Sequence, residues 1–178
     1  MDTSPDQKLI VRAKHGDLNA FEAILAPALE KAYRYACAML HDADLAEDAV
    51  QEACVRAWQK LGRLRAGSPF DPWFLGIVNR QCREHMRGSW WRLIRMPSVG
   101  SSAVELPEDV AVRRARLREA LGELTDRERQ VLILRLYLDL PWAEVAAVAG
   151  LSEAGARTRY YRALDRFRFS RGSQEVTT

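Results

Sequence analysis

The chain has 178 residues, of which 48% are hydrophobic and 29% are charged. This balance is typical of a globular protein and excludes a disordered chain, and the length allows one ordinary domain or two small ones. The net charge is only +3, but residues 42–52 carry five acids and no Lys or Arg, whereas residues 153–171 carry six Arg against two acids. We therefore expect at least two contact surfaces of different charge.

The N-terminal residues have neither the basic start nor the apolar run of a signal peptide. No apolar stretch approaches the ~20 residues needed to span a bilayer. The sequence therefore predicts a cytoplasmic protein without membrane insertion.

Three widely spaced cysteines, Cys37, Cys54 and Cys82, offer no disulfide framework and fit a reducing compartment. Cys37 with His41 and Cys82 with His85 have helical spacing, so a metal site is geometrically conceivable. Structural roles for these residues are favoured, and we expect neither a metal nor a cofactor.

The first half of the chain has the apolar period of helices, without alternating β-branched runs. Helices are predicted at about 5–14, 17–40, 43–61 and 71–86. Pro27 is expected to kink or divide the second helix. The fourth follows a Gly- and Pro-containing loop, and Asp71 as N-cap with Pro72 at the first helical position favours its start.

Residues 97–112 have little periodicity and contain small residues, Pro and acids. This composition is typical of a flexible linker, and it predicts a domain boundary. We therefore expect an all-α protein of two small helical domains. The predicted divisions are a first domain at 1–96, the linker at 97–112, a second domain at 113–172 and a tail at 173–178.

The second domain has the spacing of a helix-turn-helix. Thr125 with Glu128 forms a capping box at the start of one helix. The next helix runs from Pro141 to Gly150, and the last begins after Ser152, its predicted N-cap, so a tight turn separates them.

The last helix has two different faces. The inward stripe consists of Ala156, Tyr160, Ala163, Leu164 and Phe167, and the small Ala154-Gly155-Ala156 opening allows close packing at the turn. In helix-turn-helix proteins the start of the second helix meets base edges, where Arg can pair with guanine while flanking Arg neutralise phosphates. A solvated basic face is the alternative. The predicted DNA-binding residues are Arg157, Thr158, Arg159, Tyr161, Arg162 and Arg166.

Residues 41–87 hold an acidic helix, a loop and a helix that opens Pro-Trp-Phe, and residues 124–168 hold the helix-turn-helix. The first stretch follows most of the pattern D-A-E-D-x-V-Q-E-x-F-x-x-A-W and then P-W-L, with Cys54 in place of the Phe and Phe74 in place of the Leu. The corresponding residues are Asp44, Glu47, Asp48, Val50, Gln51, Glu52, Ala57, Trp58, Pro72, Trp73 and Phe74. In this order the two stretches resemble regions 2 and 4 of bacterial RNA polymerase sigma factors, and most closely those of the extracytoplasmic-function (ECF) type.

The resemblance implies a non-enzymatic protein that binds core RNA polymerase, through its β′ coiled coil and β flap, and directs it to promoters. It also implies an anti-sigma factor as a partner. The acidic helix would dock on the coiled coil, as electrostatic complementarity favours, although a solvated acidic face is the alternative. The implied polymerase contacts are Asp44, Glu47, Asp48, Gln51, Glu52, Arg56 and Trp58.

By the same resemblance the last helix would read the −35 element, and the loop before residue 71 with the following helix would hold melted −10 DNA. Apolar walls and polar groups can hold an unstacked base, but Phe70 and Trp73 fit a core role equally well. The family often has Asn at the position of Arg80, whereas here Asn79 lies one residue earlier. The implied −10 contacts are Arg63, Leu64, Arg65, Ser68, Phe70, Trp73, Asn79, Arg80, Arg83 and Arg87.

Two other functions are compatible with parts of the sequence. A helix-turn-helix regulator with a sensing or dimerising N-terminal half is the main alternative, and the acidic motif and the Phe-Asp-Pro-Trp loop argue against it. A helical metal enzyme using Glu47, Asp48, Glu52 and His85 would need paired Glu-x-x-His motifs, which are missing. No Gly-rich phosphate loop or nucleophile elbow is present either.

Overall fold

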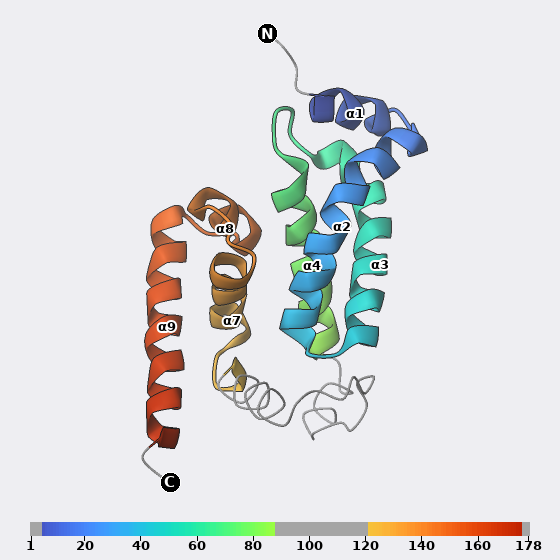
Figure 1. Ribbon diagram of the computed structural model, residues 1–178. Coiled ribbons are helices and arrows are strands. Elements are labelled where there is room, and N and C mark those ends of the chain that lie inside the picture. Colours follow the sequence, from blue (N-terminus) through green and yellow to red (C-terminus); the bar gives the residue numbers. More distant parts are fainter. Residues whose placement is uncertain (1–4, 88–120, 176–178) are drawn as a thin grey trace. The chain divides into compact units, whose positions relative to one another are not determined.

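The computed structural model describes residues 5–87 and 121–175 (Figure 1). Helices dominate both ranges and no strand occurs in them, which confirms the predicted all-α fold. The chain divides into two compact units between Arg87 and Gly88, and each unit is described by itself. The predicted linker 97–112 and the neighbouring tryptophans Trp90 and Trp91 lie outside the described residues.

The first unit is a helical bundle. Its helices are α1 (Pro5–Lys14), α2 (Leu18–Leu40), α3 (Ala43–Lys60) and α4 (Phe70–Arg87), with the 3₁₀ turn η1 (Leu61–Arg63) after α3. The long helices α2, α3 and α4 pack side by side, and α1 crosses one end of them (Figure 1).

Local residues set the ends of these helices. The side chain of Asp17 accepts a hydrogen bond from Ala20 N at 3.0 Å, and that of Asp42 accepts one from Leu45 N at 3.0 Å. Each therefore satisfies an amide that the first turn leaves unpaired. His41 ends α2 in the left-handed region at φ 58° and donates its N–H to Cys37 O.

Two local predictions differ from the structure. Pro27 does not divide α2, because its side chain is exposed and the carbonyl that it leaves unpaired can bond water. Helix α4 begins at Phe70, so Asp71 is not the N-cap. Asp71 instead lies in the first turn, where an acid favours the helix dipole, and it pairs with Lys31 at 3.1 Å.

Small and aromatic residues build the core of this unit. Ala46, Ala49, Ala53 and Ala57 of α3 are fully buried, which lets α3 approach its neighbours closely. At the end crossed by α1, aromatic rings from three helices meet at centroid distances of 5.1–6.3 Å. This aromatic cluster consists of Phe21, Trp58, Phe70, Trp73 and Phe74.

The second unit contains α7 (Asp126–Leu132), the π-helical turn η2 (Ile133–Tyr137), α8 (Trp142–Ala149) and α9 (Glu153–Glu175). Helices α7 and α8 both pack against α9 (Figure 1). The predicted capping box is confirmed, since Thr125 Oγ1 accepts from Glu128 N and Glu128 Oε2 accepts from Thr125 N at 3.0 Å. Gly150 ends α8 at φ 66°, in the left-handed region that favours glycine.

The small residues that open α9 have different roles. Ala156 is fully buried, as predicted, but Ala154 is exposed. A Cβ at position 155 would lie 3.2 Å from Ser152 Oγ, the atom that accepts the Gly155 N–H at 3.1 Å. Gly155 therefore makes room for the helix cap.

Candidate polymerase- and DNA-binding surfaces

One face of α3 is a continuous exposed stripe that is acidic in its N-terminal half. Its members are spaced three or four residues apart, so they lie on one side of the helix. This α3 stripe consists of Asp44, Glu47, Asp48, Gln51, Val55 and Trp58. The opposite side of α3 carries the buried alanines, so the structure brings five of the seven predicted polymerase contacts together on the outward face.

The α3 stripe becomes apolar towards its C-terminal end. Val55 is 58% exposed and Trp58 is 36% exposed, while the Trp58 ring also packs 5.1 Å from Phe21. Sequence analysis missed Val55, because an isolated valine on an amphipathic helix is normally expected to face inward.

The other two predicted polymerase contacts, Glu52 and Arg56, are directed towards α4. Glu52 Oε2 accepts a hydrogen bond from Gln81 Nε2 at 2.6 Å, and Arg56 pairs with Glu84 at 3.4 Å. Burial alone would raise the pKa of Glu84, but hydrogen bonding to Arg80 and the charges of Arg56 and Arg80 outweigh it and lower the pKa. Glu52 and Arg56 therefore stabilise the packing of α3 on α4.

The loop between η1 and α4 is anchored by apolar residues at both ends. Leu64 is 3% exposed and Phe70 is 6% exposed, so these two predicted −10 contacts pack in the core. Trp73 is half-buried beside Phe70, at a centroid distance of 5.7 Å. Between the anchors, Arg65 is exposed and Ser68 is half-buried, and Arg63 is exposed just before the loop.

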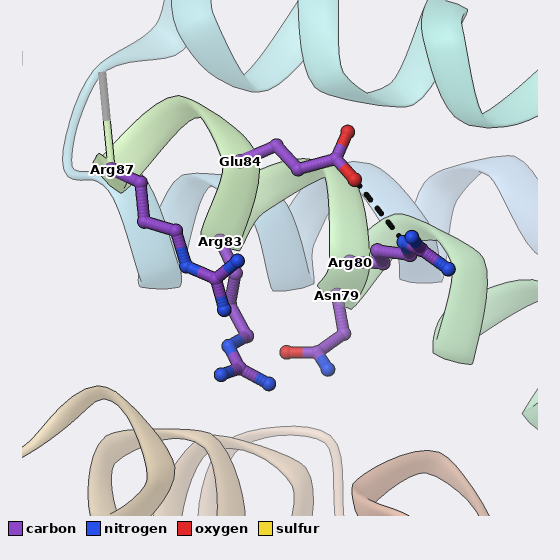
Figure 2. A pocket seen from close by; sticks show the side chains of 5 residues that line it. All are labelled: Asn79, Arg80, Arg83, Glu84 and Arg87. Carbon is purple, nitrogen blue, oxygen red and sulfur yellow. Dashed lines mark hydrogen bonds and ion pairs between the residues drawn. The ribbon is translucent and has the colours of Figure 1, made fainter.

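Helix α4 carries a basic surface around a cavity of about 350 Å³ (Figure 2). Arg83 and Arg87 lie beside each other and point the same way as Asn79, whereas Arg80 turns to Glu84 and pairs with it at 3.1 Å. Three guanidinium groups against one carboxylate make this surface suited to an anion. The lining residues of this α4 cavity are Asn79, Arg80, Arg83, Glu84 and Arg87.

Asn79 is held from inside the bundle. It is 7% exposed, and its Oδ1 accepts a hydrogen bond from the Tyr35 hydroxyl at 2.8 Å. Because this bond fixes the orientation of the amide, the side-chain NH₂ group of Asn79 is the group that can donate to a ligand in the α4 cavity.

Helix α9 separates its two tyrosines as the sequence predicts. Tyr160 is 9% exposed and meets the Trp142 ring edge-on at 5.2 Å, while Tyr161 is 56% exposed. The two rings nevertheless touch, at a centroid distance of 5.3 Å. Tyr160 therefore packs α9 on α8 and also supports the outward ring of Tyr161.

Arg157 lies over the face of Trp142, with its Cζ 4.8 Å from the ring centroid. Arg135 lies 5.4 Å from the same ring and is fixed by bonds of 3.0 Å to Asp139 Oδ1 and Leu140 O. Such stacking favours a defined guanidinium position. The start of α9 thus presents Arg157 from an ordered aromatic platform.

The remaining predicted DNA-binding residues of α9 differ in their exposure and in the bonds that they make within the unit. Thr158 is exposed and donates its hydroxyl to Ala154 O at 2.9 Å, a bond within its own helix. Arg162 is exposed and Arg159 is half-buried. Arg166 pairs with Glu128 at 3.0 Å, so it ties α9 to the capping box of α7.

Two exposed apolar side chains in η2 were also missed by sequence analysis. Leu136 is 58% exposed and Tyr137 is 51% exposed. They belong to the run Val131–Leu138, in which all residues but Arg135 are apolar, so periodicity does not indicate which of them face outward.

Within residues 5–87 and 121–175, no group of three or more His, Cys, Asp and Glu side chains is placed to hold a metal ion. The same part of the chain contains no helix that is long and apolar enough to cross a membrane.

Two family models match the chain, Sigma-70 region 2 at residues 26–92 and Sigma-70 region 4 at residues 114–167. Together they span more than half of the sequence, and they match the two units in the order that the motifs predict.

Curated relatives agree with these matches. The RNA polymerase sigma-H factor of Pseudomonas aeruginosa is 26% identical over 89% of this chain and 89% of the relative. The ECF RNA polymerase sigma factor BldN of Streptomyces coelicolor is 28% identical over 92% of this chain, which spans 64% of that relative.

A solved structure of the sigma factor RpoE with the anti-sigma factor NepR, from Bartonella quintana, has the same fold. It aligns with a TM-score of 0.65 at 23% identity and covers 84% of this chain and 95% of the solved one. The region 2 and region 4 matches, in sequence order and on two helical units, identify this chain as a member of the sigma-70 family, of the ECF type.

Proposed function

We propose that this sigma factor divides its promoter-directing function between its two units, with residues 1–96 as region 2 and residues 113–172 as region 4. The observation that carries this proposal is the separation of charge. The acidic α3 stripe lies on the first unit and the outward Arg of α9 lie on the second. Residues 97–112 are assigned as the linker and 173–178 as the tail.

The α3 stripe is assigned to core polymerase. Its acidic half suits the β′ coiled coil through charge complementarity, which raises association rates and selects partners. Its exposed Val55 and Trp58 add an apolar contact, of the kind found at the centre of protein interfaces. The β flap is assigned to the second unit, where Leu136 and Tyr137 expose apolar surface.

The start of α9 is assigned to the −35 element. Arg157 is presented from the Trp142 platform and Tyr161 is exposed, and this part of a second helix is the one that enters the major groove in helix-turn-helix proteins. Arg159 and Arg162 flank it and are assigned to phosphates.

The basic surface of α4 and the preceding loop are assigned to melted −10 DNA. Arg83 and Arg87 suit the phosphate backbone, while the NH₂ group of Asn79 suits a base edge in the α4 cavity. The buried Leu64 and Phe70 are assigned a supporting role under the loop.

This chain is further proposed to be a cytoplasmic, non-catalytic subunit that works without a cofactor and is controlled by an anti-sigma factor. The RpoE structure, in which a related fold is bound to its anti-sigma factor, supports such a partner. The alternative of a plain helix-turn-helix regulator predicts DNA binding without polymerase.

Reconstitution with core RNA polymerase tests the function. The full chain should form a stoichiometric complex and support run-off transcription from its own promoters, selected from a library. Arg157→Ala should reduce transcription from −35-dependent promoters while leaving complex formation unchanged. Loss of polymerase binding in that variant would show that the recognition face is misassigned, and DNA binding without any polymerase complex would favour the plain regulator.

A further inference from the structure

The loop between η1 and α4 is held by a helix from a distant part of the sequence. Leu64 and Phe70 anchor the ends of this loop, but Arg65, Ala66 and Gly67 between them are exposed. Gly67 adopts φ +78°, in the left-handed region. Figure 1 shows the loop rising to the end of the bundle that α1 crosses.

Gln7 of α1 binds the loop backbone with both ends of its side-chain amide. Gln7 Oε1 accepts the Gly67 N–H at 3.3 Å, and Gln7 Nε2 donates to Ser68 O at 3.2 Å. An amide side chain carries one acceptor and a donor group in one plane, so it pairs with two consecutive residues much as a neighbouring backbone would.

Lys14 extends the same interaction to the start of the loop. Its Nζ donates to Leu64 O, across 50 positions of sequence. Lys14 is half-buried, so this charge-assisted bond is partly shielded from water. The two side chains lie seven residues apart on α1, two helical turns, and therefore share one face of the helix.

The loop has little backbone bonding of its own to replace these contacts. Its turn is closed by the Ser68 N–H bond to Arg65 O at 3.1 Å. An exposed segment with few backbone bonds samples many conformations unless other groups fix it. The contacts from α1 therefore determine which loop conformation is presented to a ligand.

We propose that α1 is a positioning element for −10 recognition, in which Gln7 and Lys14 hold the loop at residues 64–69 in the conformation that receives single-stranded DNA. This inference rests on the proposed function of that loop. Fixing a binding segment in advance improves affinity because less ordering is left to occur on binding. Neither residue needs to touch DNA for this role.

The test uses the complete chain in reconstituted holoenzyme. Binding of a fluorescent non-template −10 oligonucleotide is compared for wild type, Gln7→Ala and Lys8→Ala, the last being an exposed position on the same helix. Gln7→Ala should weaken oligonucleotide binding about tenfold, the scale expected for two lost hydrogen bonds. Lys8→Ala should have a smaller effect, and holoenzyme assembly should be unchanged in both variants.

Hydrogen exchange of the Gly67 amide supplies a readout that is independent of DNA. It should become faster in Gln7→Ala and remain unchanged in Gln7→Glu, which keeps the acceptor for Gly67 N–H. Gln7→Glu should still weaken oligonucleotide binding, because it sets a carboxylate oxygen against Ser68 O.

The outcomes separate this inference from the function on which it rests. Wild-type holoenzyme that does not bind the oligonucleotide would contradict the −10 assignment itself. Wild-type binding together with undiminished binding by Gln7→Ala and Gln7→Glu would overturn the role of α1. Loss of holoenzyme assembly in both Gln7→Ala and Gln7→Glu would overturn the role of α1 too, since Gln7 would then support the whole first unit.

Discussion

Replacing Tyr35 by Phe should destabilise the first unit by removing a single buried hydroxyl. Tyr35 is fully buried, and its hydroxyl donates to Asn79 Oδ1 at 2.8 Å. Burial raises the pKa of Tyr35 well above its ordinary value, so the hydroxyl stays protonated and remains a donor at any physiological pH. Phe keeps the ring and its packing, so the change isolates the hydrogen bond.

The expected cost follows from what the substitution leaves behind. Asn79 is 7% exposed, so its Oδ1 loses its donor in a place that water barely reaches. Leaving a buried acceptor without a partner costs about 1–3 kcal/mol in free energy of unfolding. In a unit of this size each kcal/mol lowers the melting temperature by about 4–8 °C.

Urea unfolding of the complete chain, followed by tryptophan fluorescence, measures this cost. Tyr33→Phe is the matched control, because Tyr33 belongs to the same helix but is 42% exposed. A double-mutant cycle with Asn79→Ala assigns the cost to the pair, since Tyr35→Phe should cost less in that background. If Tyr35→Phe is no more destabilising than Tyr33→Phe, the hydrogen bond between Tyr35 and Asn79 does not stabilise the bundle.

Burial raises the pKa of Cys82 to about 12, so this thiol should be the last of the three cysteines to react with iodoacetamide at neutral pH. Peptide mass spectrometry measures the order of modification in the folded chain, and early modification of Cys82 would contradict its burial. Burial alone would raise the pKa of Glu128, but hydrogen bonds from Thr125 and the guanidinium group of Arg166 lower it below the ordinary value of 4.5. A carboxyl group whose pKa is lower in the folded than in the unfolded protein stabilises the fold at pH values above its unfolded pKa. This stabilisation is lost as the pH falls through the folded-state pKa. Thermal melts of Glu128→Gln between pH 3 and 7 (about the range that brackets carboxyl titration) should therefore show a weaker acid-dependent loss than wild type, and parallel curves would exclude this contribution. Trp142→Leu removes the platform under Arg157 and should weaken −35 duplex binding about two- to fivefold, the scale of an exposed cation–π contact; equal fluorescence-anisotropy titrations would refute it.

Features that depend on a few neighbouring residues could be predicted from the sequence. The capping box at Thr125, the Ser152 cap and the glycine at position 150 each act within four residues, so local chemistry determines them. The division between Tyr160 and Tyr161 followed from helical period alone.

Features that depend on distant partners could not be predicted in this way. Arg166 has the sequence context of a phosphate contact, yet it pairs with Glu128, 38 positions away. Asn79 is engaged by Tyr35 across 44 positions. Periodicity tells which face of a helix is polar, but it does not tell which neighbouring helix will meet a given charge.

The same limit applies to exposed apolar residues. Val55, Leu136 and Tyr137 are all more than half exposed, although their residue types favour the core. Only the packed helices reveal that these side chains are exposed, and these positions then extend the surfaces proposed for polymerase.

In the proposed division of function, the α3 stripe binds polymerase while the start of α9 reads DNA. Affinity for core RNA polymerase, measured side by side for wild type, Asp48→Lys and Arg157→Ala, tests it most directly. We expect Asp48→Lys to weaken the complex, because it reverses a charge in the exposed acidic half of the stripe, and Arg157→Ala to leave it unchanged while promoter-specific run-off transcription falls. Wild-type affinity in Asp48→Lys, or loss of affinity in Arg157→Ala, would contradict the division of function between the two units.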